Sequence, residues 1–195
     1  MPYTREHKRR TRQRILASAF ALFSRRGFDN VSIDELMEHA GLTRGGFYAH
    51  FASKAEVYAE AIGAAVAHSR LGQEKPAEMD ERTWTKGLLE AYLSREHVEA
   101  ESGMCPLAFL ATDVGIRNRE VRSAYGKGYE KLHAQVVERV EAGPDDDPEE
   151  IAFAVTAMMI GCVAIGRALP EKATGDRLLA ACRRQAWKLL NPARE

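Results

Sequence analysis

The segment Val31–Lys54, VSIDELMEHAGLTRGGFYAHFASK, constrains the fold of this chain more than any other. Ser32 can cap a first helix, Glu35 lies at the capping-box spacing, and Gly41 is where that helix would stop. Thr43 can then cap a second helix. Two short helices joined by a tight turn with glycine form a helix-turn-helix, whose second helix enters the DNA major groove.

The rest of the chain also favours helices. Alternating β-branched runs, the signal for strands, are nearly absent. The sequence therefore predicts an all-α protein of about nine helices. Outside the opening segment, we expect helices over residues 8–26, 53–69, 82–97, 106–114, 119–141, 148–167 and 176–190. We expect a DNA-binding domain over residues 1–54, linked by the helix from residue 53 to a ligand-sensing and dimerisation domain over residues 55–195.

Charge is distributed unevenly along the chain. Up to residue 54 there are ten Lys and Arg against five Asp and Glu, and the remaining counts are 18 and 23. A net charge of +5 on the N-terminal part indicates that this end meets a polyanion, although a solvated helix face is an alternative. The N-terminal arm could reach phosphate or the minor groove, or be a solvated tail. Its basic residues are Lys8, Arg9, Arg10 and Arg12.

Other features of the sequence bear on the location of the protein. The three cysteines are odd in number and widely spaced, which argues against a disulfide scaffold and for a reducing cytoplasm. No run of eighteen apolar residues is present, and no apolar segment follows the basic N-terminus as in a secretory signal. We therefore expect a cytoplasmic protein.

The last two expected helices predict a dimer. Asp147 and Pro148 form a helix-start signal, and the segment that follows is apolar almost all round and rich in small residues. Such a helix must be buried on most sides. Pairing of residues 148–167 and 176–190 with a second copy would give a four-helix bundle. The alternative is that earlier helices of the same chain bury them.

Residues 11–62 resemble the tetracycline-repressor (TetR) family of bacterial transcriptional regulators. The resemblance lies in four pieces of sequence: Arg26-Gly27-Phe28, Val31-Ser32-Ile33, Gly41-Leu42-Thr43, and Phe47-Tyr48-x-His50-Phe51 followed by Ser53-Lys54. The later segment MCPLAFLATDV resembles one subgroup of effector domains. The resemblance implies a homodimer that binds a palindromic double-stranded operator, most commonly as a repressor, and responds to a small-molecule effector.

The resemblance also implies which residues meet DNA. Five positions match backbone-contacting or groove-facing places in the family: Ser32, Thr43, Tyr48, His50 and Lys54. Hydroxyl groups and a lysine suit contacts to phosphate. Arg44 is the best candidate base reader, because its planar fork fits guanine O6 and N7.

Gly45 and Gly46 are poor choices for helix stability, since each costs about 1 kcal/mol relative to alanine. One interpretation is that bare backbone allows the helix to lie deep in the groove. The others are that the helix is irregular at its start, or that Gly46 is a close-packing position.

The body is expected to sense an effector, and a small apolar or aromatic molecule suits its aromatic content. Candidate pocket residues, each of which could instead be plain core, are Trp84, Tyr92, Met104, Cys105, Phe109, Tyr125 and Tyr129. Cys105 precedes a helix that starts at Pro106, so helix N–H groups could stabilise its thiolate. Sensing of oxidants or electrophiles through Cys105 is therefore an alternative, against an inert packing role. Cys162 and Cys182 lie on apolar helix faces and are expected to be packing residues.

Two other classes of function compete with a regulator. An enzyme is not expected: His97-Val98-Glu99 with Cys105 only faintly matches a zinc-deaminase pattern, and its Pro-Cys-x-x-Cys partner is missing. No glycine-rich phosphate loop, HExxH or GxSxG motif occurs, and no cofactor or metal site is predicted. An architectural DNA-binding protein without an effector is the second alternative.

Overall fold

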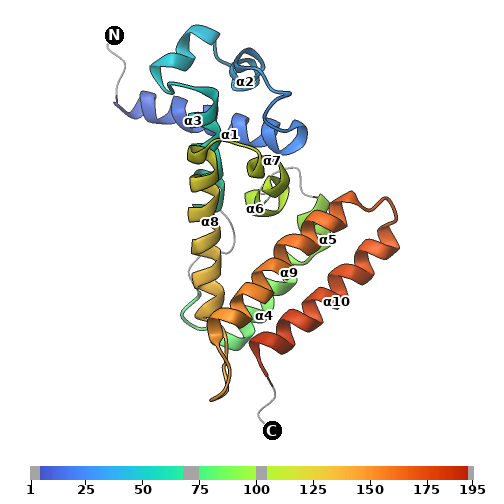
Figure 1. The fold of residues 1–195 in the computed structure, drawn as a ribbon. Helices are drawn as coiled ribbons and strands as arrows, with labels where there is room; N and C mark the ends of the chain where they lie inside the picture. Colours follow the sequence, from blue (N-terminus) through green and yellow to red (C-terminus); the bar gives the residue numbers. More distant parts are fainter. Residues whose placement is uncertain (1–4, 68–74, 100–104, 193–195) are drawn as a thin grey trace. The chain divides into compact units, whose positions relative to one another are not determined.

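The computed structural model describes residues 5–67, 75–99 and 105–192 (Figure 1). These residues form ten α-helices and one 3-10 helix, with no strand among them. The predicted all-α fold is confirmed, with more and shorter helices than expected. The elements are α1 (Arg5–Arg26), α2 (Ile33–His39), η1 (Arg44–Ala49), α3 (Lys54–Ala67), α4 (Glu81–Tyr92), α5 (Arg95–Glu99), α6 (Pro106–Phe109), α7 (Ala111–Gly115), α8 (Arg119–Val137), α9 (Pro148–Ala168) and α10 (Lys172–Leu190).

The chain divides into two compact units. The first combines residues 1–67 with 105–128, and the second combines residues 68–104 with 129–195. The boundary thus falls within α8. The first unit contains the predicted helix-turn-helix together with α6 and α7, so it takes in more of the chain than the DNA-binding domain expected from sequence.

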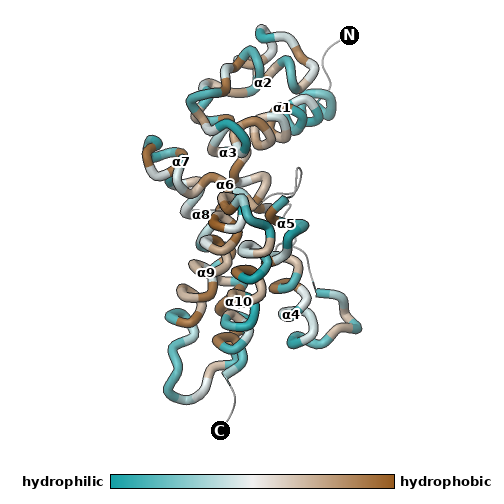
Figure 2. The backbone as a smooth tube through the Cα atoms, turned by 90° about the vertical axis from the view of Figure 1, so that its right-hand side faces the viewer, coloured by the Kyte–Doolittle hydropathy of each residue, from teal (hydrophilic) through white to brown (hydrophobic). Residues whose placement is uncertain are grey.

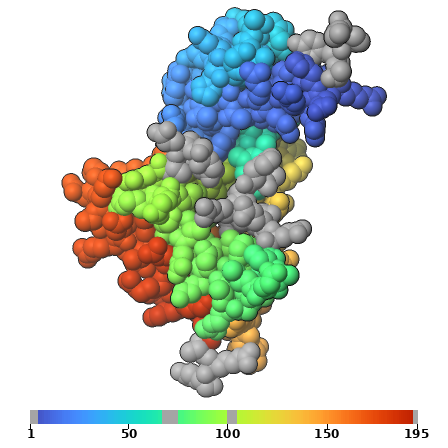
Figure 3. All heavy atoms as spheres, turned by 180° about the vertical axis from the view of Figure 1, so that it is seen from behind, coloured from blue at the N-terminus to red at the C-terminus, as the bar shows by residue number. Residues whose placement is uncertain are grey.

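In the first unit, α1, α2, η1 and α3 enclose one apolar core. The largest of its fully buried side chains are Ile15, Phe23, Leu36, Met37, Phe47, Phe51, Tyr58 and Ile62. In Figure 3 the blue spheres of α1 and α2 pack into one continuous body. Gly27 ends α1 with φ +73°, and Gly41 follows α2 with φ +65°. The helix end that the sequence predicted at Gly41 is therefore present.

Several expected helices have different bounds. The helix predicted over 82–97 is broken after Tyr92, because Ser94 accepts the His97 N–H at 3.1 Å and starts α5. The helix predicted over 106–114 is split at Leu110, which lies between α6 and α7. The last helix begins at Lys172, four residues earlier than predicted.

In the second unit, α9 and α10 form an antiparallel pair (Figure 1), and α10 also contacts α4 and α5, whose green spheres lie beside it in Figure 3. Figure 2 shows the apolar character of α9 along most of its length. By length and mean hydropathy, 1.9, α9 could cross a bilayer, and a third of that window, 33%, is buried. The core helix of a soluble protein meets the same criteria. Here α9 packs along α10.

Candidate nucleic-acid interface

A reciprocal capping box starts α2. The Ser32 hydroxyl accepts the Glu35 N–H at 3.2 Å, and the Glu35 carboxylate accepts the Ser32 N–H at 2.8 Å. Hydrogen bonds to the Glu35 carboxylate from the Ser32 N–H and from the Ser32 hydroxyl, with a further one from Arg26, lower the pKa of Glu35 to about 2. The predicted cap is confirmed. Ser32 is exposed, and its own hydroxyl donates to the Glu35 carboxylate at 2.8 Å.

The turn after α2 is held by backbone and by α1. The N–H groups of Gly41 and Leu42 donate to carbonyls of α2 at 2.8 Å each. Arg14 of α1 donates to the Ala40 carbonyl at 2.6 Å. A Cβ on Gly41 would lie 3.0 Å from that guanidinium, in addition to the cost of its positive φ. Glycine is therefore favoured at this position.

The second helix of the motif is the six-residue 3-10 helix η1, not an α-helix. Its irregularity agrees with the interpretation that two glycines weaken the start of this helix. Thr43 precedes η1 with an exposed side chain that makes no capping hydrogen bond, so the predicted threonine cap is wrong. The Gly46 N–H instead donates to the Thr43 carbonyl at 3.1 Å, as a 3-10 turn requires.

One face of η1 is buried and the other is open. Phe47 is fully buried, whereas the adjacent Tyr48 is 62% exposed. A Cβ built on Gly45 would meet no atom within 4 Å, and one on Gly46 would lie 3.7 Å from the Met37 Cε. Gly45 therefore leaves bare backbone on the open face, and Gly46 packs on the inner side.

Arg44 lies on the open face and pairs with Asp34 of α2 at 2.8 Å. Both side chains are more than half exposed, at 65% and 56%. An exposed ion pair contributes about 0–1 kcal/mol, so Arg44 can exchange this partner for a base or a phosphate at little cost.

Lys54 at the start of α3 turns back onto the first unit. Its ammonium donates to the carbonyls of Phe28 and Val31 at 2.8 and 2.9 Å, and it lies 4.2 Å from the centre of the Phe28 ring. Burial lowers the pKa of Lys54. The side chain therefore ties the turn after α1 to α3, and its three hydrogen-bond donors are largely committed there.

His50 follows η1 and is half-buried. Its Nδ1 atom is buried, with no hydrogen-bond partner in the part of the chain that the structure describes. Burial, and then the positive charges of Lys8, Arg12 and His7, lower the pKa of His50. A neutral imidazole surrounded by cations can become protonated when a phosphate approaches.

The N-terminal arm is helical from Arg5 onwards, as part of α1. Lys8, Arg9 and Arg10 are exposed there. Arg12 differs, because its guanidinium donates to the Glu60 carboxylate at 2.6 Å and lies 4.3 Å from the centre of the Phe51 ring. Three of the four basic side chains thus remain open to solvent.

Sequence reasoning missed a polar cluster in the first unit around Asp113 of α7. This carboxylate accepts hydrogen bonds from the Phe28 N–H at 3.3 Å, the Tyr58 hydroxyl at 2.6 Å and Arg117 at 2.7 Å. Arg117 also makes a bidentate ion pair with Asp29, with both hydrogen bonds at 2.9 Å. The cluster ties α7 to the turn after α1 and to α3. The only local signal for it is the spacing of Asp113 and Arg117.

The surroundings of the side chains in this cluster determine which of them are ionised. Burial raises the pKa of Asp113, but the hydrogen bonds from Arg117 and Tyr58 outweigh it, so the net shift is downward. Burial, and then the hydrogen bond to Asp113, raise the pKa of Tyr58. The carboxylate is therefore ionised and the phenol neutral at neutral pH.

The aromatic residues expected to line an effector pocket are divided between the two units. Phe109 and Tyr125 belong to the first, where the Tyr125 hydroxyl donates to the Leu107 carbonyl at 2.8 Å. Tyr92 and Tyr129 belong to the second: Tyr92 is buried, and the Tyr129 hydroxyl lies 3.0 Å from the Thr156 hydroxyl. Met104 lies outside the described residues.

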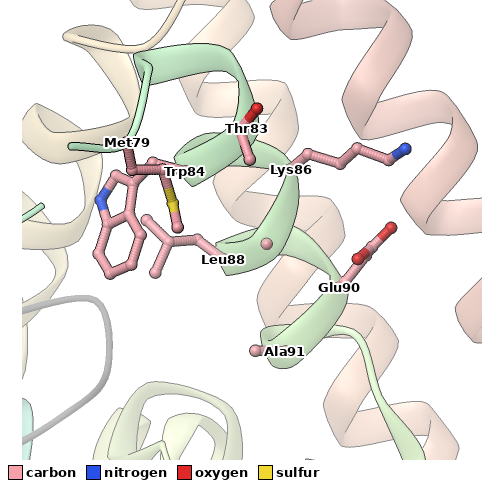
Figure 4. Close-up of a pocket in the computed structure, with 8 residues that line it drawn as sticks. Met79, Thr83, Trp84, Lys86, Leu88, Glu90 and Ala91 are labelled. Carbon is pink, nitrogen blue, oxygen red and sulfur yellow. The ribbon is translucent and has the colours of Figure 1, made fainter. Parts of the chain in front are cut away.

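Trp84, in the second unit, lines a surface pocket of about 530 Å³ on α4. Figure 4 shows Met79, Trp84 and Leu88 gathered on one side of the helix, while Lys86 and Glu90 point away from them. The indole Nε1 is buried and has no hydrogen-bond partner among the described residues. The indole N–H is therefore a donor whose hydrogen bond the described residues do not supply.

Cys105, in the first unit, is 5% exposed and precedes α6. This helix has only four residues, so its dipole is small, and Cys105 makes no side-chain capping hydrogen bond to it. Neither observation favours a reactive thiolate.

Comparisons with known proteins agree on one family. Residues 15–61 match the model for bacterial regulatory proteins of the tetR family. The chain is 33% identical over 101 residues to TtgW of Pseudomonas putida, a helix-turn-helix regulator of uncharacterised function, covering 48% of this chain and 69% of TtgW. It is 40% identical over 57 residues to the regulator AcrR of Shigella flexneri, covering 29% of this chain and 26% of AcrR. A TetR-family regulator from Cytophaga hutchinsonii superposes with a TM-score of 0.73 at 25% identity, over 92% of this chain and 94% of that one.

Proposed function

The chain belongs to the TetR family of DNA-binding transcriptional regulators, and from this premise we propose that it is a ligand-released repressor. In this proposal a homodimer binds a palindromic operator in the cytoplasm. A small apolar or aromatic effector then lowers its affinity for the operator. The proposal rests on the exposed face of η1, where polar side chains lie beside the bare backbone of Gly45.

The reading surface consists of the exposed residues around η1: Ser32, Thr43, Arg44, Gly45 and Tyr48. Arg44 reads a guanine in the major groove, giving up its exposed pair with Asp34 to do so. The hydroxyls of Thr43 and Tyr48 contact phosphates, and Gly45 allows the backbone to approach the DNA closely.

Two predicted contact residues have supporting roles in this proposal. His50 meets phosphate as an imidazole that gains a proton on binding, because burial and then the nearby positive charges disfavour that proton before DNA binds. Lys54 positions the motif through the carbonyls of Phe28 and Val31, and the positive end of α3 beside it attracts phosphate. Gly46 is a packing position against Met37.

Dimerisation through α9 and α10 is supported by the outer face of α9. Phe153 and Ile165 on this face are 50% and 53% exposed. Between them the small residues Ala154, Ala157 and Gly161 permit close approach of a second helix. A second copy that covers this face would form a four-helix bundle, and the symmetric pair would match a palindrome.

Release by an effector follows from linkage. A ligand that binds more tightly to a dimer with displaced reading heads lowers DNA affinity by the same differential free energy. Two reading heads must lie about 34–36 Å apart to meet successive major grooves. The indole N–H of Trp84, which has no partner among the described residues, supports an effector with an aromatic ring and a hydrogen-bond acceptor.

Two alternatives predict different behaviour. Sensing through Cys105 predicts that electrophiles modify this thiol and abolish DNA binding; its burial and the short α6 weigh against that outcome. An architectural protein without an effector predicts that no small molecule changes the affinity for DNA.

The test is fluorescence anisotropy with duplexes from the DNA upstream of the gene itself and with a random duplex, each at about 50 and 200 mM salt. We expect Arg44→Ala to reduce the preference for the operator over random DNA roughly tenfold or more. The matched control is Arg122→Ala, an exposed arginine on α8, which should behave as wild type. No preference of the wild-type protein for any palindromic duplex would overturn the proposal.

A further inference from the structure

The ion pair of Asp34 and Arg44 connects α2 to η1 on the exposed side of the helix-turn-helix. Asp34 lies in the first turn of α2, and Arg44 is the first residue of η1. A single hydrogen bond joins them, from the Arg44 Nη1 to one Asp34 carboxylate oxygen at 2.8 Å. The guanidinium has five N–H donors, and no other of them reaches a described residue. Asp34 therefore holds Arg44 by one donor and leaves the others open.

Asp34 differs from the other acidic side chains of this region in what it binds. The Glu35 carboxylate accepts the hydrogen bonds of the capping box, and the Glu60 carboxylate is bound by Arg12 of α1. Both of these acids stabilise the structure of the first unit. The partner of Asp34 is instead the side chain that is expected to read a base. A negative charge thus lies on the surface that meets a polyanion.

Random DNA and an operator offer Arg44 different acceptors. A phosphate is a single anionic acceptor, much like the carboxylate that already holds the arginine. Exchanging Asp34 for a phosphate therefore gains little, and it leaves an unpaired carboxylate beside the negative charge of DNA. A guanine presents O6 and N7 in one plane, and a bidentate contact to them favours the correct base by roughly five- to 150-fold. Guanine can therefore displace Asp34 where phosphate does not.

We infer that Asp34 is a specificity-determining residue, which keeps Arg44 from the phosphates of random DNA and releases it to a guanine of the operator. Asp34 acts through Arg44, so it is a positioning residue and not a DNA contact. The inference rests on the proposed function, since it requires that η1 meets DNA. It adds that an acidic side chain of α2 sets part of the preference for the operator.

Asp34→Asn should strengthen binding to random DNA more than binding to the operator. The neutral amide leaves Arg44 free to contact phosphate on any sequence. One more phosphate contact steepens the slope of log K against log salt by about 0.9, so the affinity for random DNA should rise roughly tenfold at about 50 mM salt, and about 3.5-fold less at about 200 mM. On the operator Arg44 contacts guanine in both proteins, and the variant gains only the exposed pair that is no longer broken, at most about fivefold.

Three further variants separate release of Arg44 from the loss of a negative charge. Glu38 lies four residues further along α2, is exposed and pairs with no described residue, so Glu38→Gln is the matched control. It should change the salt slope less than Asp34→Asn does. Asp34→Glu keeps a carboxylate within reach of Arg44 and should behave as wild type. In the Arg44→Ala background, Asp34→Asn should have no more effect than Glu38→Gln has.

The measurement is fluorescence anisotropy with operator and random duplexes at about 50, 100 and 200 mM salt. Urea denaturation of each variant shows that it is folded, and Asp34→Asn should unfold as wild type does because the pair is exposed. A wild-type protein without preference for any palindromic duplex would overturn the proposed function. If the wild type prefers an operator but Asp34→Asn leaves the affinity and salt slope on random DNA unchanged, this inference alone fails. An equal effect of Asp34→Asn with and without Arg44 would also overturn it.

Discussion

The polar groups of the helix-turn-helix in the first unit and those of the aromatic residues in the second unit differ in their surroundings. Arg44 and Tyr48 extend into solvent from a short helix that Phe47 anchors in the core. In the second unit, the Tyr129 hydroxyl is bound by Thr156, and only the Trp84 indole N–H is left buried and unpartnered among the aromatic candidates described there. The polar groups of the helix-turn-helix are thus exposed and available to a partner. In the second unit, by contrast, the Tyr129 hydroxyl is used within the structure of the protein itself.

The neighbours Phe47 and Tyr48 give the largest test of this difference. Phe47→Ala removes a fully buried ring and should destabilise the protein by about 3–5 kcal/mol. Tyr48→Ala removes an exposed ring and should change the stability by less than about 0.5 kcal/mol, while weakening DNA binding. Urea denaturation followed by circular dichroism measures the first effect, and anisotropy with operator DNA measures the second. Equal losses of stability would show that the open face of η1 is structural.

The helix-turn-helix was predictable because its signals are local. The capping box at Ser32 and Glu35 and the stop at Gly41 need only neighbouring residues. The same sequence did not decide the 3-10 character of η1, because the two glycines weaken an α-helix without specifying what replaces it.

The contacts that could not be predicted from the sequence join residues that are distant in sequence. Lys54 donates to carbonyls that lie 23 and 26 residues away in sequence. Asp113 accepts a hydrogen bond from Tyr58, at a separation of 55 residues. Periodicity shows that such residues are on a helix, but not which distant group lies opposite.

Asp113→Asn should give the next largest effect, because it removes the charge that joins three segments of the first unit. The side chains of Asp113 and Arg117 are 19% and 12% exposed, so the expected loss is about 1–3 kcal/mol, less than for a fully buried pair. Asp113 has a lowered pKa in the folded state. Its contribution is therefore present above the unfolded value of about 3.9 and is lost as the pH falls through the lower folded value.

The measurement is urea denaturation of wild type and Asp113→Asn between pH 7 and pH 2. The difference between the two curves should be largest at neutral pH and shrink below about pH 4. Asp34→Asn, at an exposed ion pair, is the control and should have a small effect throughout. A difference that stays constant down to pH 2 would mean that the charge of Asp113 is not what stabilises the cluster.

Two glycines in the helix-turn-helix test whether its geometry serves folding or binding. Gly41→Ala meets a positive φ and the Arg14 guanidinium, so we expect a loss of about 1–2 kcal/mol. Gly45→Ala has open space and no positive φ, and should leave stability unchanged or raise it by up to about 1 kcal/mol. If bare backbone meets DNA, Gly45→Ala should still weaken operator binding. Wild-type affinity in this variant would assign the glycine to local structure alone.

The smallest effects come from removing single polar atoms in the second unit. Thr156 donates to the Ala152 carbonyl, so the Tyr129 hydroxyl is the donor in its contact with Thr156. Tyr129→Phe removes the hydrogen bond that the buried Thr156 oxygen accepts, and should lower the free energy of unfolding by about 1 kcal/mol. Trp84→Phe removes a buried N–H that has no described partner, which offsets the apolar area lost with the larger ring. We therefore expect Trp84→Phe to cost less than Tyr129→Phe in thermal denaturation without ligand.

An effector that accepts the indole hydrogen bond would reverse this order. With such a ligand present, the wild-type protein should gain thermal stability that Trp84→Phe does not, while Tyr129→Phe keeps the gain. The reversal separates a donor held for a ligand from a packing residue whose N–H is merely tolerated. If Trp84→Phe is stabilised by every ligand that stabilises the wild type, the second unit binds its effector elsewhere. Trp84 would then be a packing residue whose buried N–H has no partner among the described residues.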